Sequence, residues 1–249
     1  MEYGAAMILY EDKELIVCHK PAGIPVQSAR VGQKDMVSIL NNYLAEHGKN
    51  TGAEPVRVVH RLDQPVEGVI VFAKTKRAAA GLTRQITEGN MRKVYRAVCC
   101  VDNDARERYV CGQERYTLVD YLVKDGRTNT SHVAKQGDRD AKRAELSFSI
   151  LAVREHLALA EIELMTGRHH QIRVQMAHAG LPLYGDQKYH PDWKKYVSGE
   201  KDTAAECGGY AAAMRTQLAL CAVSLGFRHP VGGKKMEFTV EPEGEIFRF

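Results

Sequence analysis

The segment Val59-His60-Arg61-Leu62-Asp63 places a carboxylate two residues after a guanidinium. In extended backbone, residues two apart share a face, so Arg61 and Asp63 can point the same way. A neighbouring guanidinium lowers the pKa of a carboxyl group and keeps it ionised. An ionised carboxylate can act as a nucleophile or a base. The same residues could instead form an ordinary surface ion pair that closes a loop.

The residues after Asp63 predict a turn followed by a buried strand. Pro65 disfavours helix in the residue before it, and Gly68 permits a turn. The run Val69–Ala73 is continuously apolar, which is typical of a strand buried on both faces. We therefore expect His60–Asp63 to lie on strand or loop backbone, with the carboxylate just before the turn.

Strands outnumber helices in the rest of the sequence. Apolar or alternating runs predict strands over 7–10, 15–18, 92–101, 143–153, 157–165, 215–227 and 237–240. Helical spacing predicts a helix over 37–44 capped by Asp35, a helix over 76–88 that stops at Gly89, and a third that begins near Arg168 with Thr166 as its cap. Segments 48–55 and 191–209 indicate loops. Because β and α elements do not alternate regularly, we expect an α+β fold with a largely antiparallel mixed sheet and flanking helices.

Length and composition limit the class of protein. The chain has 249 residues and 44% of them are hydrophobic, which suits one large domain or two small lobes. No apolar run approaches the roughly 20 residues that span a bilayer, and the amino terminus lacks the pattern of a secretory signal. We therefore expect a cytoplasmic protein without a membrane partner. Nothing indicates an obligate oligomer, so we expect a monomer.

The cysteines and histidines do not predict a metal site. The six cysteines form no Cys-x-x-Cys pair, and we expect them to be reduced thiols used as small apolar residues. His169, His170 and His178 lack a second set of ligands at a suitable spacing, so hydrogen bonds or phosphate contacts are the expected roles. The sequence also has no nucleophile elbow, dinucleotide fingerprint or phosphate loop.

The distribution of charge says more than the net charge of +4. Between Lys74 and Arg96 seven basic residues face Glu88 as the one acid, and a second basic group surrounds Arg168 and Arg173. Such runs are often solvated faces. Their functional interpretation is contact with RNA phosphates, which positions a nucleic acid without reading its bases.

Several motifs together resemble the RluA-type RNA pseudouridine synthases. The segment from His60 to Gly68 resembles the HRLDxxTSG signature of that family. Lys93-Val94-Tyr95 resembles its Lys-x-Tyr strand, and 166–174 resembles its TGRTHQIRVH helix. The later matches keep the family's order: 177–180, Pro182, Gly185-Asp186, Tyr189 and 227–230. The resemblance runs from about residue 8 to about residue 242.

This resemblance implies the pseudouridine synthase catalytic fold and its reaction. We expect a single catalytic domain over 1–249, with two lobes around a central cleft and without the accessory RNA-binding domain that many relatives carry at the amino terminus. The implied reaction isomerises uridine to pseudouridine in rRNA or tRNA without a cofactor. The enzyme must take the base out of its stack, which costs a few kcal/mol.

The resemblance also assigns roles to individual residues. Asp63 matches the catalytic aspartate, which forms a covalent adduct with either the sugar or the base. Tyr95 matches the tyrosine that stacks on the uracil, although a core tyrosine is the alternative. Arg173 matches the basic residue paired with the aspartate. The expected substrate-binding residues are Ile172 as an apolar wall, Arg61 in the space left by the flipped nucleotide, His60 and Arg168.

The sequence departs from the family pattern at three places. Val66-Glu67 replaces the usual Thr-Ser, and a second acid near Asp63 could raise its pKa or repel phosphate. His169 replaces a threonine and Gln175 replaces a histidine. Two other hypotheses therefore stay open. One is a catalytically silent RNA-binding factor on the same scaffold, and the other is an unrelated hydrolase that uses Asp63 with Glu67.

Overall fold

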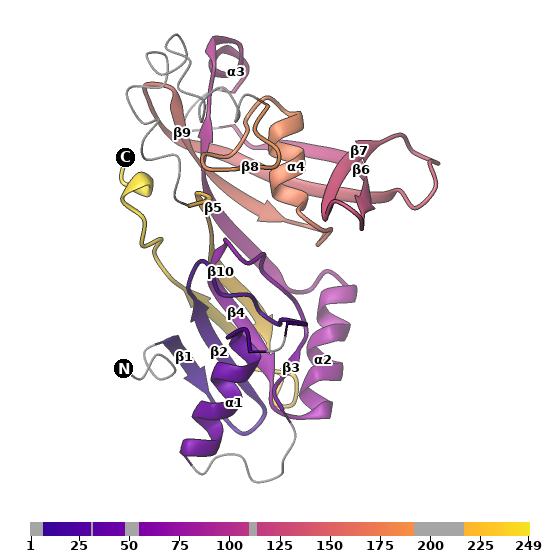
Figure 1. The fold of residues 1–249 in the computed structure, drawn as a ribbon, viewed down its shortest axis with the longest axis vertical. Coiled ribbons are helices and arrows are strands. Elements are labelled where there is room, and N and C mark those ends of the chain that lie inside the picture. The colour runs from indigo at the N-terminus through magenta and orange to yellow at the C-terminus, as the bar shows by residue number, and fades with distance from the viewer. Residues whose placement is uncertain (1–6, 31, 48–54, 110–113, 192–216) are drawn as a thin grey trace. The chain divides into compact units, whose positions relative to one another are not determined.

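The structure is a computed structural model that describes residues 7–30, 32–47, 55–109, 114–191 and 217–249 (Figure 1). The chain separates into two compact units. Unit 1 comprises residues 1–93 and 222–242, and unit 2 comprises 94–221 and 243–249. The division falls within the strands β5 (Arg92–Cys100) and β10 (Leu220–Arg228). In the ranges described, no helix is long and apolar enough to cross a membrane.

Unit 1 is a sheet with one helix on each side. Besides its parts of β5 and β10, its elements are β1 (Ile8–Glu11), β2 (Leu15–Lys20), α1 (Met36–Glu46), β3 (Arg57–Val58), β4 (Glu67–Ala73), α2 (Lys76–Thr87) and β11 (Lys235–Thr239). Its strands are hydrogen-bonded in the order β1-β2-β4-β10, with β3 on β4 and β11 on β10. The strands β2 and β4 are antiparallel, and Lys20 stands opposite Gly68.

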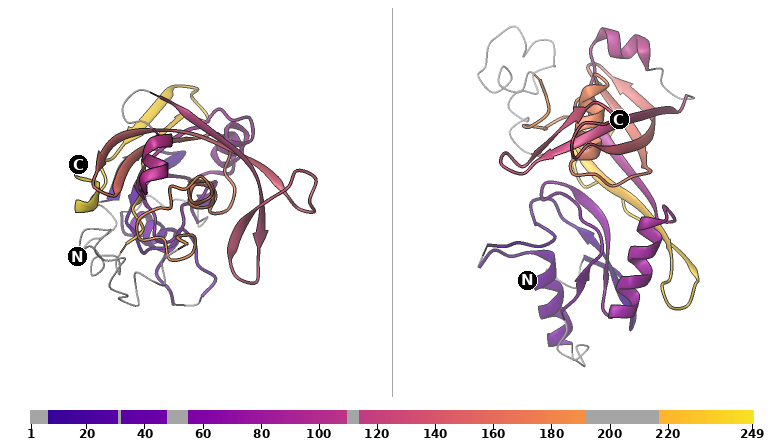
Figure 2. Two further views of the ribbon diagram at one scale, coloured as in Figure 1. Left: turned by 90° about the horizontal axis from the view of Figure 1, so that it is seen from above. Right: turned by 90° about the vertical axis from the view of Figure 1, so that its right-hand side faces the viewer.

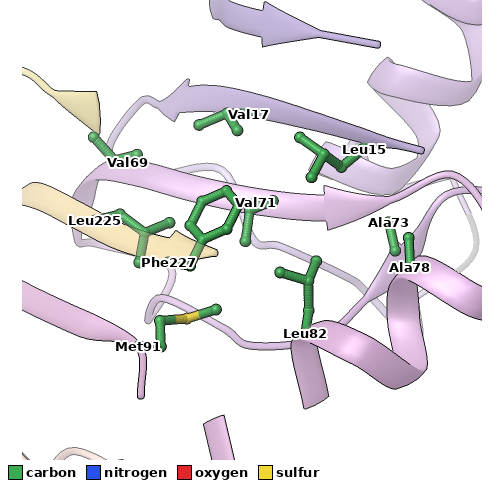
Figure 3. Packing of buried hydrophobic residues seen from close by; sticks show 10 residues of the cluster. All are labelled: Leu15, Val17, Val69, Val71, Ala73, Ala78, Leu82, Met91, Leu225 and Phe227. Carbon is green, nitrogen blue, oxygen red and sulfur yellow. The ribbon is translucent and has the colours of Figure 1, made fainter. Parts of the chain in front are cut away.

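The core of unit 1 explains the apolar run after the signature. All seven residues of β4 are buried, as expected for a strand covered on both faces. Alternate residues, Val69 and Val71, pack with Leu15 and Val17 of β2 against Leu82 of α2 (Figure 3). The helix α1 lies on the opposite side of the sheet from α2 (Figure 2). The predicted buried strand is confirmed.

Side-chain caps fix where the two helices of unit 1 begin. Asp35 Oδ1 accepts the Ser38 N–H at 2.8 Å, and Ser38 Oγ accepts the Asp35 N–H at 3.1 Å, which together form a capping box. Thr75 Oγ1 accepts the Ala78 N–H at 3.1 Å at the start of α2. Gly89 follows α2 with a φ of +72°, a conformation that glycine adopts at low cost. The predicted cap at Asp35 and the stop at Gly89 are confirmed.

The motif 227–230 joins three parts of unit 1. Gly232 N–H donates to His229 Nδ1 at 2.9 Å, so the ring proton is on Nε2, which donates to Asp12 Oδ2 at 2.9 Å. Arg228 exchanges two hydrogen bonds with the Gln85 side chain at 2.7 and 2.8 Å. These contacts connect the β10–β11 turn to the β1–β2 turn and to α2, which gives this motif a structural role.

Unit 2 is built on a second run of strands, in the order β5-β9-β8-β6-β7. Its other elements are α3 (Asn103–Arg108), β6 (Tyr116–Asp125), β7 (Thr130–Ala134), β8 (Lys142–Arg154), β9 (Leu157–Leu164), α4 (Gln171–His178) and the 3-10 helix η3 (Glu245–Phe247). The β6–β7 hairpin projects from the rest of this sheet (Figures 1 and 2). Val174 of α4 packs against Leu122 of β6 and Ala144 of β8.

The expected α+β fold with a largely antiparallel sheet is confirmed, since every strand pair whose register is described is antiparallel. The prediction that Thr166 caps the third helix is wrong. Thr166 Oγ1 instead donates to the Gln171 side chain at 2.8 Å, and α4 begins at Gln171 after a turn. The sequence pattern did not predict α3 or the β6–β7 hairpin. The loops predicted over 48–55 and 191–209 lie almost entirely outside the described residues.

Substitution of Gly68 can test whether the close approach of the β4 and β10 backbones contributes to stability. The φ of Gly68 is +126°, and a Cβ there would lie 2.4 to 2.7 Å from backbone atoms of Ala222.

We predict that Gly68→Ala lowers the free energy of unfolding by about 3 kcal/mol or more, through backbone strain and overpacking. Gly89→Ala is the matched control, because it also has a positive φ but an added Cβ would have no heavy atom within 4 Å. Its expected cost is about 1–2 kcal/mol. Urea unfolding measures both, and equal losses would contradict the packing argument.

Candidate active site

Asp63 lies on the loop between β3 and β4, directly before the turn predicted from Pro65. Its carbonyl oxygen accepts the Val66 N–H at 3.0 Å and closes that turn. The Asp63 side chain is half-buried, whereas the Arg61 side chain is exposed and Leu62 between them is buried. The carboxylate is therefore partly shielded from water.

The loop that carries Asp63 is held by a buried ammonium that sequence analysis did not single out. Lys20 is 0% exposed, and its Nζ donates to the carbonyl oxygens of Pro21, Ile24 and Gln64 at 2.9, 2.7 and 3.2 Å. Gln64 also exchanges two hydrogen bonds with the backbone of Gly23, both 2.9 Å long. The loop after β2 and the residue after Asp63 are thus fixed to each other. The signal in the sequence was Lys20-Pro21 at the end of an apolar strand.

The electrostatics of Lys20 involve both acids of the signature. Burial lowers the pKa of Lys20 to about 8, while the negative charges of Asp63 and Glu67 oppose the shift. Glu67 is only 2% exposed at the start of β4. The acid that replaces a short hydroxyl residue in the family pattern is therefore a buried counter-charge to Lys20, and the neighbouring replacement Val66 is 2% exposed as well.

After β3 ends, the His60 side chain accepts a backbone hydrogen bond from β4, as the carbonyl of a paired strand would. Its Nε2 accepts the Val71 N–H of β4 at 3.2 Å. Burial and then the charge of Lys93 lower the pKa of His60 to about 3. The ring is therefore neutral at physiological pH, so a contact with substrate would use hydrogen bonding and not charge. Its assignment as a substrate-binding residue stays a prediction.

The remaining predicted site residues belong to unit 2. Tyr95 is 7% exposed in β5, where it stands opposite Ile162 of β9. Ile172 and Arg173 are 5% and 6% exposed on α4, so adjacent residues of this short helix are both buried. Arg168 is exposed just before α4, and its Nε donates to the Arg143 carbonyl oxygen at 2.9 Å.

Arg173 is the most firmly held of these residues. Its Nε and Nη2 donate to the two carboxylate oxygens of Asp186, each at 2.7 Å. Its guanidinium carbon lies 5.1 Å from the ring centroid of Tyr189, within the range of a cation–π contact. Asp186 and Tyr189 are parts of the motif pattern in the sequence, which by itself predicted no role for either residue.

The two departures around α4 both find partners. His169 stacks on His170 with ring centroids 3.7 Å apart, and its Nδ1 lies 2.9 Å from Ser131 Oγ. Gln175 is 0% exposed, and its Nε2 donates to Asp120 Oδ2 at 2.8 Å. The structure thus accommodates both side chains by hydrogen bonding. In the part of the chain that the structure describes, no group of three or more His, Cys, Asp or Glu residues could hold a metal ion.

A comparison with protein families decides the identity of this scaffold. The profile described as RNA pseudouridylate synthase matches residues 14–178, a span that includes β2, the Asp63 loop, β5 and α4. The chain belongs to this family. The pseudouridine synthases most similar in sequence include the ribosomal large subunit pseudouridine synthase D of Zymomonas mobilis. It is 34% identical over an alignment of 239 residues that covers 94% of this chain and 68% of the relative. The resemblance to the RluA type is confirmed.

Two further comparisons show how much of its relatives this chain covers and which fold it shares. The uncharacterized RNA pseudouridine synthase YhcT of Bacillus subtilis is 35% identical over 76% of this chain, and the match spans 59% of its own length. The chain thus spans less than two thirds of this relative. The solved structure of human RNA pseudouridylate synthase domain containing 4 is similar with a TM-score of 0.71 and 24% identity, over 98% of this chain and 91% of that one. It supports the pseudouridine synthase fold.

The predicted site residues are distributed over both units. His60, Arg61 and Asp63 lie together in unit 1, and Tyr95, Arg168, Ile172 and Arg173 lie in unit 2. The structure adds Lys20 beside the first set and Asp186 beside the second.

The pKa of Lys20 leads to a prediction about pH. The folded-state pKa of about 8 lies below the value of about 10.4 in an unfolded chain. Between these values the folded protein binds fewer protons, so this group makes folding more favourable as pH rises through that window. The slope is at most about 1.4 kcal/mol per pH unit.

We predict that Lys20→Met removes this contribution and also lowers the free energy of unfolding by about 1–3 kcal/mol at pH 7, because buried carbonyls lose their donor. Urea unfolding from pH 7 to 10 measures both effects. The difference between wild type and Lys20→Met should grow with pH above 8. A difference that stays constant over this range would contradict the assignment.

Proposed function

We propose that this chain isomerises uridine to pseudouridine in rRNA or tRNA, with Asp63 as the nucleophile. The observation that carries the proposal is membership in the RNA pseudouridylate synthase family over a span that includes Asp63. The relatives named as ribosomal large subunit pseudouridine synthases support an rRNA substrate. The half-buried position of the carboxylate, on a loop held by Lys20, suits a reactive group.

The proposed reaction needs no cofactor because its atoms balance within the substrate. The bond between the ribose C1′ and uracil N1 breaks, the uracil turns, and a bond from C1′ to C5 forms. A proton leaves C5 and N1 gains one. The carboxylate of Asp63 supplies the nucleophile and forms an adduct with either the sugar or the base. The bond between Asp63 and the substrate breaks again before the product leaves, which restores the carboxylate.

The other residues support this step in the roles that the resemblance assigns. Tyr95 stacks on the uracil, which is worth about 1–3 kcal/mol per base. Arg173 favours the ionised form of the nucleophile, and Ile172 supplies an apolar wall. Arg61, which is exposed, occupies the space of the flipped nucleotide. His60 and Arg168 contact the substrate.

Exposed basic side chains on unit 1 support RNA as the partner. Lys76, Arg77 and Arg84 of α2 are exposed, and so is Arg92 at the start of β5. Such a surface contacts phosphates and gives binding that weakens as salt rises. We propose that the protein acts as a monomer in the cytoplasm.

The two alternatives make different demands on Glu67. A hydrolase that pairs Asp63 with Glu67 needs a second acid that reaches its substrate, but Glu67 is 2% exposed and acts on the charge of Lys20. A silent RNA-binding factor was motivated by the loss of hydroxyl residues at this position. Because the negative charge of Glu67 favours the charged form of the buried Lys20, its presence does not by itself argue against catalysis.

The decisive test is Asp63→Asn. We predict that purified Asp63→Asn protein still binds RNA but forms pseudouridine at least about 1,000-fold more slowly, because an amide is not a nucleophile. The measurement is pseudouridine formation in rRNA and tRNA from cells that lack the protein, with RNA binding followed at low salt. Asp104→Asn is the matched control, since Asp104 is an exposed aspartate on α3.

Each other outcome has a definite meaning. Full activity of Asp63→Asn would contradict the role of this residue. Salt-sensitive RNA binding by the wild-type protein without pseudouridine in any RNA would favour the silent factor. Failure of the wild-type protein to bind RNA at low salt would favour the hydrolase.

A further inference from the structure

Arg173 is a buried cation that makes two parallel hydrogen bonds to the Asp186 carboxylate. Its side chain is 7% exposed and that of Asp186 is 0% exposed. The two hydrogen bonds of 2.7 Å run in parallel from Nε and Nη2 to the two oxygens of Asp186. Such a fork fixes both the position and the plane of a guanidinium, which one hydrogen bond cannot do.

Asp186 is itself held so that it cannot follow a movement of Arg173. Its Oδ1 also accepts the N–H groups of Lys188 and Tyr189 at 2.9 and 3.2 Å. The residue before it, Gly185, has a φ of +77°, and a Cβ there would lie 2.3 Å from the Gln217 carbonyl oxygen. The backbone at this point is therefore closely packed, and only glycine fits.

Tyr189 completes the support from the other side of the guanidinium. Its ring lies under the Arg173 guanidinium carbon at 5.1 Å. Its hydroxyl accepts the Ser131 N–H at 2.8 Å and pairs with His170 Nδ1 at 2.6 Å. Lys188 Nζ donates to the Asn129 carbonyl oxygen at 2.7 Å, in the β6–β7 turn. The segment 186–189 thus connects Arg173 of α4 to the β6–β7 hairpin.

The fork fixes which edge of the guanidinium faces Asp186. Asp186 engages the edge made by Nε and Nη2. Any group that Arg173 meets in the reaction must therefore be met through Nη1 or through the second N–H of Nη2. A small rotation of the side chain would move these donors, and misplacement by about 1 Å can cost about 100-fold in rate.

We propose that Asp186 is the positioning residue that orients Arg173 for uridine isomerisation, an inference that rests on the proposed function. It does not touch the substrate and acts through Arg173. Asp186 thereby gives the Gly185-Asp186 motif a function beyond packing.

The test compares variants of purified full-length protein on RNA that the wild-type protein modifies. Asp186→Glu keeps the charge but pushes the guanidinium outward, and Asp186→Asn removes the charge. We expect kcat to fall about 10- to 100-fold for both, while RNA affinity stays within about threefold. Asp120→Asn is the control, because Asp120 accepts a hydrogen bond from Gln175 of the same helix but does not pair with Arg173. Its kcat should match that of the wild type.

A double variant separates positioning from a merely structural role. In Arg173→Gln protein, the addition of Asp186→Asn should not lower kcat further, because the residue through which Asp186 acts is already gone. Circular dichroism and thermal melting show which variants are folded. If Asp186→Asn does not fold, the inference is tested with Asp186→Glu and with the double variant. The double variant buries two neutral amides instead of an unpaired charge.

The outcomes distinguish this inference from the proposed function. Wild-type kcat in folded Asp186→Glu, or a further loss in the double variant, would overturn the positioning role while leaving the function intact. Absence of pseudouridine with the wild-type protein would overturn the function itself. Full activity of Arg173→Gln would overturn the role of Arg173 and with it this inference.

Discussion

A buried ammonium needs acceptors for its three N–H groups and negative charge nearby, and Lys20 obtains both from residues around the Asp63 loop. Three carbonyl oxygens accept from its Nζ, and Asp63 and Glu67 supply the charge. Because one of these carbonyls belongs to Gln64, the residue beside the proposed nucleophile cannot move without breaking this set of bonds. The close approach at Gly68 then fixes the strand that follows. The position of the carboxylate thus depends on β2 as much as on its own loop.

Unit 2 also contains a buried cation that needs acceptors and a counter-charge, here a guanidinium. Arg173 is buried on α4, and a buried charge is costly unless it is paired and hydrogen-bonded. Asp186 provides the pair and Tyr189 the aromatic face. In both units a buried cation is satisfied by hydrogen bonds to residues outside its own strand or helix. Each cation is therefore held in place before any substrate arrives, which is the arrangement that preorganised catalysis requires.

The departures from the family pattern follow one physical rule. A buried polar side chain is tolerated when it is hydrogen-bonded or paired. Glu67 has the charge of Lys20, His169 has Ser131, and Gln175 has Asp120. These replacements changed local partners and left the residues that match catalytic positions in place. A single sequence cannot show this, because the compensating residues lie tens of positions away.

Sequence alone determined what depends on near neighbours. The cap at Asp35, the stop at Gly89, the buried strand β4 and the turn after Asp63 all follow from side chains within a few residues, and so does the set of motifs that indicated the family. It did not determine the start of α4, because Thr166 bonds to the Gln171 side chain instead of capping the helix. It also did not predict the half-exposed β6–β7 hairpin. Only the tertiary structure decided that Lys20 bonds to Gln64, 44 residues away, and that Arg173 pairs with Asp186, 13 residues away. Burial creates the need for a counter-charge, and folding alone decides which residue supplies it.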